Sequence, residues 1–597
     1  TYIIADDVDP GTALLLIEMG RMGKLVRTVD LPDITTITTA DYQQYGRRLN
    51  ENTSSSPSGL HHGHDKAAAQ CDDLSAFFAY QMTVIIHTGL RPARWGVALQ
   101  VMLEKIAGVC LVDKLRSIQL YEADYNWFNK FVFNDAAMAA LESSGCLPEE
   151  HFSQRGSTAE DACLDKTLTT DISRQSRQPM AVISVDAAQC YDRVNHSMMA
   201  LVWLALKLPF QAVSIIVGCL QFMRIYTRTG WGDSSRYFGG EQQLVPFCGL
   251  GQGSKAAPAS WIQLSSVIVN AFKSKGFGAM IHDPIDGSVS HTVGCLFVDD
   301  TDLYVMNDAW ATPQQLAAAA QQHISWWAWL LNATGGAIKS TKSFWYFITY
   351  SCVDGKWKYD DTQTALSVPL PDGEIGTLHS QLSTVVAKTL GVLSAPCGGH
   401  AAQLSAMRTK ADEWTRSIVN GHLPSSNVWM SYHQQLWPRL RYGLSSLTND
   451  LGAASQCLTG VEYTILPLLG VNRNIKRGWR HLHQTFGGVG LLDLPTEQFI
   501  CRLNIFLQHY GTPSALGHKL SASLHWLQLQ IGCVGSPLRA QYRIWSHLSP
   551  SCWLKCLWES LEAYSVDMDM QYNSIPLQRE NDMSVMDFLQ DQVTSTL

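Results

Sequence analysis

Two adjacent aspartates interrupt a strand-forming run, and they constrain the fold of this chain more than any other feature. Residues 293–305 read Val-Gly-Cys-Leu-Phe-Val-Asp-Asp-Thr-Asp-Leu-Tyr-Val, with Asp299 and Asp300 at the middle. Two short apolar segments joined by a two-residue turn are typical of a β-hairpin, so we expect both carboxylates at its tip. Adjacent carboxylates repel each other unless a cation lies between them, which makes the tip a candidate half of a metal site. Asp is also a common turn residue, so the pair alone does not establish that site.

The length of the chain predicts several domains. At 597 residues it exceeds what one hydrophobic core serves, and three or four domains or subdomains are expected. No apolar segment approaches the length of a membrane-spanning helix, so we expect no membrane partner. The fifteen cysteines are scattered without a Cys-x-x-Cys pair. That pattern argues against a zinc ribbon and favours reduced thiols in an intracellular protein.

Charge is unevenly distributed along the chain, whose net charge is −8. Residues 557–597 hold eight acidic residues against one basic residue, which is typical of a solvated tail. Residues 401–482 hold nine Lys and Arg against four acidic residues, with aromatic residues interleaved. Because phosphate binding depends on local patches and bases stack on aromatic rings, this region is a candidate nucleic-acid surface. Its candidate binding residues are Arg408, Lys410, Arg416, Arg439 and Arg441.

Two further segments place unusual residues where a ligand could use them. Residues 180–185 form a buried strand by composition, and Asp186 ends it, where a carboxylate needs solvent or a cation. Tyr191 follows five residues later, within reach of whatever Asp186 binds. The glycine-rich segment 249–261 leads into a predicted helix, and its glycines permit close approach of the backbone to a flat or charged ligand.

Two further elements are predicted from local patterns, a strand pair before these segments and a long helix between them. Strand-like pieces at 97–103 and 115–120 enclose a loop with Lys105, and Arg116 lies on the second piece. An arginine on a rigid strand can clamp a triphosphate, although an exposed surface arginine is an equally ordinary interpretation. Residues 196–227 are expected to form one amphipathic helix.

As an ordered set, these segments resemble the palm of a reverse transcriptase, specifically those of non-long-terminal-repeat retrotransposons. The resemblance covers about residues 52–395. Retroviral relatives carry a second finger lysine where this chain has Val109, which leaves Lys105 and Lys114 as candidates for that role. The matching segments are 115–118 for the finger strand, 185–192 for motif A, 252–258 for motif B, 297–300 for motif C, 336–342 for motif D and 390–392 for motif E.

The resemblance implies an α+β fold of the right-hand polymerase type. It would have fingers, a palm built on an antiparallel sheet with packed helices, and a basic helical thumb, followed by a mainly helical C-terminal extension with an acidic tail. The expected boundaries are 1–50 for an N-terminal segment of unknown role, 51–178 for the fingers, 179–395 for the palm, 396–482 for the thumb and 483–597 for the extension.

The resemblance also implies template-directed DNA synthesis from an RNA or DNA template, a DNA primer and deoxynucleoside triphosphates. The family uses two Mg²⁺ or Mn²⁺ ions, for which Asp186 and Asp299 are the expected bridging ligands and Asp300 a supporting one. Lys342 is the expected acid for pyrophosphate, and Asp192 is expected to be structural. Tyr191 is expected to exclude a 2′ hydroxyl. The nucleotide-binding residues implied are Arg116, Lys105, Tyr191, Gln252 and Gly253.

Two other functions stay open at this point. An RNA-dependent RNA polymerase shares the palm, but Tyr191 argues against it, since that class needs room for the 2′ hydroxyl. A decayed copy of a mobile element that only binds nucleic acid is the alternative outside catalysis. Residues 498–558 contain no Asp or Glu, so they cannot supply the carboxylates of an RNase H.

Overall fold

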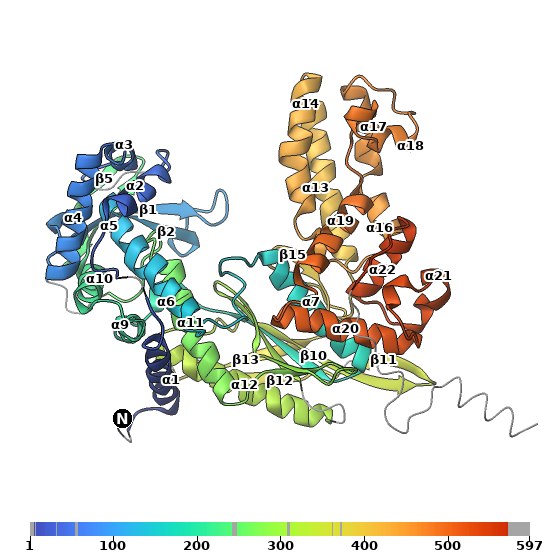
Figure 1. Cartoon of the computed structure of the whole chain (residues 1–597), viewed down its shortest axis with the longest axis horizontal. Coiled ribbons are helices and arrows are strands. Elements are labelled where there is room, and N and C mark those ends of the chain that lie inside the picture. Colours follow the sequence, from blue (N-terminus) through green and yellow to red (C-terminus); the bar gives the residue numbers. More distant parts are fainter. Residues whose placement is uncertain are drawn as a thin grey trace, which may run out of the picture.

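The protein is a mixed α+β structure in which two helical lobes stand on one side of a central sheet (Figure 1). The computed structural model describes residues 5, 7–31, 33–53, 58–241, 247–306, 311–360, 362–370 and 373–570. The α+β class predicted from the sequence is confirmed. Most of the predicted acidic tail lies beyond residue 570 and therefore outside the described residues.

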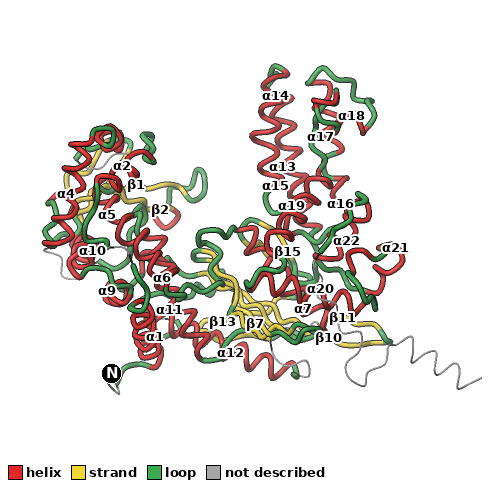
Figure 2. Tube along the Cα trace, viewed as in Figure 1, coloured by secondary structure: helices red, strands yellow, loops and turns green. Residues whose placement is uncertain are grey.

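The central sheet has the strand order β12-β13-β10-β3-β9-β8, and β11 pairs with β10 at one end. All of its pairs are antiparallel except β10 with β13. Figure 2 shows the strands between the bases of the two lobes and beneath the second lobe. The strands are β3 (Met180–Asp186), β8 (Gly294–Phe297), β9 (Asp300–Met306), β10 (Phe344–Val353), β11 (Lys356–Asp360), β12 (Ala365–Pro369) and β13 (Ile375–Gln381).

Alternation along β3 and β9 divides the buried side chains between the two faces of this sheet. Ile183 and Leu303 belong to the core that includes α11 (Ala257–Ser274) and α12 (Pro313–Ala333). Val182 and Tyr304, one residue away on each strand, belong instead to a cluster that includes Ala162 of α7 (Ala159–Ser176). Because successive side chains of a strand point to opposite faces, each strand is buried on both sides.

The first lobe surrounds a separate sheet with the order β2-β1-β4-β5. In this sheet β1 lies antiparallel to β2 and parallel to β4. Its strands are β1 (Val97–Glu104), β2 (Leu115–Leu120), β4 (Arg224–Thr229) and β5 (Gly232–Gly239). The helices of this part of the chain are α1 (Pro10–Val26), α2 (Thr39–Arg47), α3 (His62–Ala68), α4 (Asp72–Thr88), α5 (Ala123–Phe128), α6 (Ala137–Ser143), α8 (Cys190–Arg193), α9 (His196–Ala205) and α10 (Phe210–Phe222).

The single helix expected over 196–227 is wrong. The chain forms α9, turns through Lys207 at φ 60° and continues as α10 from Phe210. Pro209 disfavours a helical conformation in the residue before it, which explains the break. The last expected turns are instead the strand β4, which pairs with β1.

The second lobe contains most of the C-terminal helices. It is built around two apolar clusters, and the second of these includes Leu164 and Leu168 of α7 (Ala159–Ser176). The described part of the chain contains no helix long and apolar enough to cross a membrane. The helices are α13 (Ala401–Asn420), α14 (Ser425–Ser431), α15 (Trp437–Arg441), α16 (Leu451–Gln456), α17 (Thr459–Leu468), α18 (Arg477–His481), α19 (Leu494–His509), α20 (Ala515–Ile531), α21 (Tyr542–Trp545) and α22 (Trp553–Ala563).

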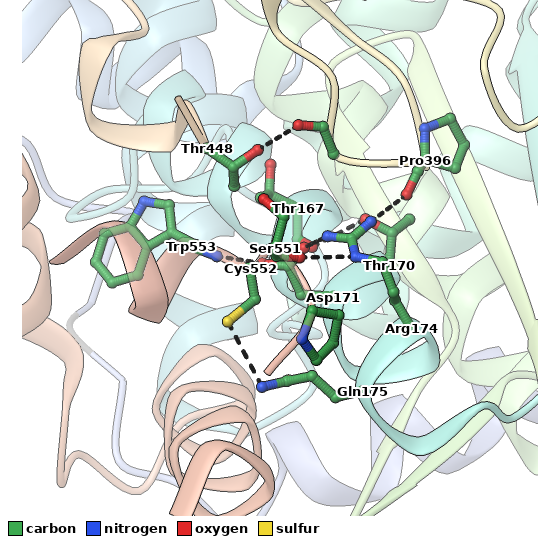
Figure 3. A network of polar contacts seen from close by, with 12 residues as sticks. Thr167, Thr170, Asp171, Arg174, Gln175, Pro396, Thr448, Ser551, Cys552 and Trp553 are labelled. Atoms are coloured by element: carbon green, nitrogen blue, oxygen red, sulfur yellow. Dashed lines mark hydrogen bonds and ion pairs between the residues drawn. The ribbon is translucent and has the colours of Figure 1, made fainter. Parts of the chain in front are cut away.

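Helix α7 is joined to this lobe through a buried polar network (Figure 3). The guanidinium of Arg174 donates to the carbonyl oxygens of Pro396 at 2.6 Å and Ser551 at 2.8 Å, and it pairs with Asp171. Asp171 in turn accepts the backbone N–H of Trp553 at 2.6 Å. Since these partners come from three distant segments, the C-terminal helices are part of the core.

Two small hairpins complete the fold, β6 (Ala279–His282) with β7 (Val289–Thr292) and β14 (Ala387–Thr389) with β15 (Val392–Ser394).

Candidate active site

A cleft of about 960 Å³ lies where the β1–β2 hairpin faces the end of β3. Segments from six distant parts of the sequence line it, including the loop before α11 and the loop at 338–342. This single cleft brings together eight of the residues singled out from the sequence, which are Lys105, Arg116, Asp186, Tyr191, Gln252, Gly253, Asp299 and Lys342. Asp300 is not among its lining residues.

The acidic hairpin forms as predicted, but its turn is one residue earlier than expected. Phe297 and Asp300 are direct partners in the β8–β9 ladder, so the two-residue turn is Val298–Asp299 and Asp300 already belongs to β9. Val298 adopts φ 57°, and its carbonyl accepts a 2.7 Å hydrogen bond from Nε1 of Trp261 on α11. The positive φ that this tight turn needs is therefore held by a tertiary contact, and Asp299 is the residue at the tip.

The second acidic strand places Asp186 opposite Asp300. The two residues are direct partners in the β3–β9 ladder, so their side chains emerge from the same face of the sheet. Loss of solvent around the carboxyl, together with the neighbouring charges of Asp299, Asp302 and Asp186, raises the pKa of Asp300 to about 6. Three like charges therefore crowd one end of the sheet, and a cation between them would relieve their repulsion.

The ligand set fits a hard divalent ion, since Mg²⁺ and Mn²⁺ prefer carboxylate oxygens. Among the residues that the structure describes, Asp299 and Asp300 have no ion pair, whereas Asp186 lies 3.3 Å from Nζ of Lys342. The ligand atoms of Asp186, Asp299 and Asp300 do not all lie within 4.8 Å of one another. Within the described ranges the group that meets this distance is Asp283, Asp286 and His525, which lies outside the cleft.

The loop after α12 fastens the end of β3. The backbone N–H of Asp186 donates to Oγ of Ser343 at 3.0 Å, and the carbonyl of Asp186 accepts the N–H of Lys339 at 2.9 Å. Ala187 and Ile338 form an isolated bridge beside these bonds. This pairing keeps Lys342 next to the acids, although more than half of its side-chain surface remains exposed.

The glycine-rich loop is pinned to the first lobe. The carbonyl of Gln252 accepts the N–H of Gln119 on β2 at 2.6 Å, and Nε2 of Gln252 donates to Asp192 at 2.9 Å. Gly253 has φ 120°, and a Cβ there would lie 2.1 Å from the carbonyl oxygen of Gln119. Only glycine fits this close approach, which explains the glycine by sterics at this position.

Tyr191 stands between these two loops. Its carbonyl accepts the N–H of Leu250 at 2.7 Å, and its ring meets that of Trp261 edge to face with centroids 6.5 Å apart. Burial raises the pKa of the Tyr191 phenol, so the side chain is neutral at physiological pH. The ring is therefore fixed beside the acids as a rigid wall of the cleft.

Two cations line the opposite wall. Arg116 pairs with Leu103 across the β1–β2 hairpin and is exposed. Lys105 comes from the loop of the same hairpin, where its backbone N–H donates to the carbonyl of Lys114 at 3.1 Å. Of the two lysines considered for this role, Lys105 lines the cleft and Lys114 is not among its lining residues.

The basic residues of 401–482 lie in the second lobe and do not line the cleft. Among their interleaved aromatic residues, Trp414, Tyr432 and Trp437 are buried in the core of that lobe. Of the other aromatic residues in this range, Trp429 is partly buried, whereas Tyr442, Tyr463 and Trp479 are exposed. The five cations singled out from the sequence are all exposed, and these are Arg408, Lys410, Arg416, Arg439 and Arg441.

Three residues that support the site were not singled out from the sequence. Trp261 and Ser343 hold the backbone of the two acidic strands, as described above. Asp302 is buried behind Asp300. Its place two residues after Asp300 was visible in the sequence, because alternate residues of a strand share one face. The two hydrogen-bond donors come from distant segments and had no local signal.

Residues 109–351 of the chain match the family model of reverse transcriptase (RNA-dependent DNA polymerase). The match covers less than half of the chain, and it includes Arg116, the two acidic strands and the glycine-rich loop. For this part of the chain it supports RNA-directed DNA polymerase activity in general, with nucleic acid and nucleotides as substrates. A search of curated proteins finds no match to the chain.

Proposed function

We propose that this protein synthesises DNA on an RNA template, and that its two lobes are the fingers and thumb of a right-hand polymerase. The lobe around β1, β2, β4 and β5 would be the fingers, and the central sheet with α11 and α12 the palm. The basic helices from α13 onward would be the thumb. The order of the motif-like segments supports an origin in a retrotransposon without long terminal repeats.

One observation carries this proposal. Cations from the β1–β2 hairpin, a glycine-rich loop and the acids of β3 and the hairpin turn, which are far apart in the sequence, line a single cleft. A nucleoside triphosphate needs positive charge at its phosphates and metal-binding carboxylates at its reacting phosphorus. The opposed walls of the cleft offer these two environments.

The residues of the cleft would divide the reaction among them. Two Mg²⁺ or Mn²⁺ ions, when bound, would supply Lewis-acid activation of the primer hydroxyl and neutralise charge at the leaving group. Asp186 and Asp299 would hold them, with Asp300 in support. The proton for pyrophosphate would come from Nζ of Lys342. The triphosphate would be held by Arg116 and Lys105.

The remaining contacts would select the nucleotide. Gln252 and Gly253 would contact the incoming base and sugar from the glycine-rich loop. Tyr191 would lie under the sugar, where its fixed ring leaves no space for a 2′ hydroxyl. Asp192 would act indirectly by orienting the amide of Gln252, to which it is hydrogen-bonded.

Primer extension tests the proposal directly. The full chain is mixed with an RNA template, a labelled DNA primer and deoxynucleoside triphosphates in Mg²⁺ or Mn²⁺, and we expect elongated DNA. Binding of the template–primer without extension in either metal would overturn the proposal and favour a decayed, nucleic-acid-binding protein. Incorporation of ribonucleotides as fast as deoxynucleotides would instead favour an RNA polymerase.

Substitution of the predicted sugar gate sharpens this test. Tyr191→Ala removes the ring beside the acids, and we expect the preference for deoxynucleotides over ribonucleotides to fall by about tenfold to a hundredfold. The measurement is the ratio of kcat/KM for the two nucleotides on one template. An unchanged ratio would remove Tyr191 from nucleotide selection while leaving the polymerase proposal intact.

A further inference from the structure

A buried lysine connects the catalytic strand to the base of the second lobe. Lys166 lies on α7 with 7% of its surface exposed. Its Nζ lies 2.8 Å from Oδ2 of Asp302 on β9 and 2.8 Å from Oγ1 of Thr389 on β14. One ammonium group thus bridges three segments that are more than 80 residues apart in the sequence.

The strand end of this bridge lies directly behind the acids. Asp302 pairs with Ser184 in the β3–β9 ladder, and the next pair along the same face is Asp186 with Asp300. The second carboxylate oxygen of Asp302 accepts the hydroxyl of Ser184. Both acidic strands are therefore fixed to α7 one residue pair away from the cleft.

The other end of the bridge leads to the second lobe. Thr389 belongs to the β14–β15 hairpin, in which Leu393 donates its N–H to Oε1 of Gln403 on α13 at 2.9 Å. Tyr442 donates its hydroxyl to the carbonyl of Leu390 in the same hairpin. The hairpin is thus bonded both to the first helix of the basic lobe and to the residue after α15.

We propose that Lys166 is a positioning residue that sets the distance between the acids and the basic lobe through Asp302 and Thr389. The proposal rests on the proposed function, in which the basic lobe holds the template–primer duplex while the acids hold the metals. Loss of the bridge would leave both parts folded but let them move relative to each other. A small displacement of the reacting hydroxyl lowers the rate of nucleotide addition but leaves the affinity for the template–primer unchanged.

The chain offers a matched control on the same face of the same strand. Nζ of Lys519 on α20 pairs with Asp165 at 2.5 Å, and Asp165 accepts the hydroxyl of Tyr304 on β9 at 3.0 Å. The lysine of this second pair is at least as buried as that of the first, because Lys519 has no exposed surface and Lys166 has 7%. It ties β9 to the C-terminal helices, and among the described residues it makes no bond to the β14–β15 hairpin.

The experiment compares Lys166→Met with Lys519→Met in the full chain. Each change leaves one buried carboxylate without its cation, so each should lower the free energy of unfolding. Only Lys166→Met should raise the rate of amide hydrogen exchange across 387–394, and only it should lower kcat for primer extension by about tenfold to a hundredfold. The dissociation constant for the template–primer should stay unchanged.

A milder pair of variants covers the case in which Lys166→Met does not fold. Thr389→Val removes only the hydroxyl that meets Lys166, and we expect kcat to fall by about threefold to tenfold. Thr389→Ser keeps the hydroxyl and should behave as the wild type.

Three outcomes are informative. Equal hydrogen exchange across 387–394 in the Lys166 and Lys519 variants would overturn the proposal, as would Thr389→Val with wild-type kcat. Wild-type protein that binds but never extends a primer would defeat the proposed function alone, because hydrogen exchange still measures the bridge.

Discussion

Carboxylates on one pair of strands have opposite surroundings within two residues of each other. Asp299 and Asp300 have no ion pair among the described residues, and Asp186 has only the mostly exposed Lys342. Asp302, two residues further along β9, pairs with the buried Lys166, and Asp165 of α7, which accepts the hydroxyl of Tyr304 on β9, pairs with the buried Lys519. Between Asp300 and Asp302, β9 thus changes from an acid without a buried partner to a neutralised acid.

This difference in ion pairing indicates which acids stabilise the fold and which are available to bind a cation. A buried carboxylate without a cation is costly, so Asp302 and Asp165 need their lysines for folding. The acids at the end of the sheet tolerate their mutual repulsion because Asp186 and Asp299 line the cleft and Asp300 is exposed to solvent. A site for divalent ions requires that unmet negative charge, and a lysine placed like Lys166 would cancel it.

The largest expected effect comes from the tip of the hairpin. Asp299→Asn keeps the shape of the side chain but removes the charge, and we expect primer extension to fall by about 10⁴-fold or more, roughly 5 kcal/mol of barrier. Stability and template–primer binding should be unchanged. The control is Asp354→Asn in the exposed β10–β11 turn, which should keep full activity. Residual activity above one tenth would contradict the assignment of Asp299 as a metal ligand.

The next effect should appear in stability rather than in chemistry. Lys519→Met leaves Asp165 buried without its cation, and we expect the free energy of unfolding to fall by about 3 to 5 kcal/mol. The folded fraction should extend primers at the wild-type rate. Denaturant unfolding followed by fluorescence measures the loss. If the free energy of unfolding fell by no more than the loss of an exposed ion pair would cause, Asp165 would not depend on Lys519 for folding, and the contrast with the acids of the cleft would fail.

A steric test separates the shape of the cleft from its charge. Gly253→Ala would bring a methyl group against the backbone of Gln119 at a positive φ, so the glycine-rich loop must shift. We expect about 1 to 3 kcal/mol of destabilisation from strain and about a hundredfold slower extension from the displaced loop. Gly230→Ala, where no atom lies within 4 Å of the added group, is the control and should have little effect.

The smallest expected effect is a pH dependence of stability from Asp300. Its folded pKa of about 6 lies above the ordinary aspartate pKa of 3.8, so the folded state holds this proton more tightly than the unfolded state. The metal-free protein should therefore lose stability as pH rises from about 4 to 6, by less than about 1 kcal/mol because solvent screens the exposed group.

Asp300→Asn should remove that part of the pH dependence. Mg²⁺ should also stabilise the wild type more than the variant, since bound cations favour the folded state. Thermal unfolding at pH 4, 5, 6 and 7, with and without Mg²⁺, checks both expectations. Identical unfolding curves for the two proteins would show that neither the neighbouring acids nor Mg²⁺ affects the ionisation of Asp300.

Local patterns in the sequence were enough for the elements that carry the site. The two short apolar segments that flank Asp299 and Asp300 predict a hairpin, and the apolar run before Asp186 predicts a buried strand, because both depend on neighbouring side chains. The ordered set of segments also indicated which residues should meet. The same local reasoning failed at 196–227, where β4 forms by pairing with β1 and not through its own helical pattern.

Tertiary structure alone decided which acids are neutralised. No feature near Asp302 in the sequence reveals that Lys166 lies beside it, since the two residues are 136 positions apart. The register of the hairpin turn also depends on a distant residue. Nε1 of Trp261 on α11 donates to the carbonyl of Val298, which leaves Asp299 at the tip. Spacing in a sequence determines which face of a strand a residue occupies, but the charge of that face depends on what folds against it.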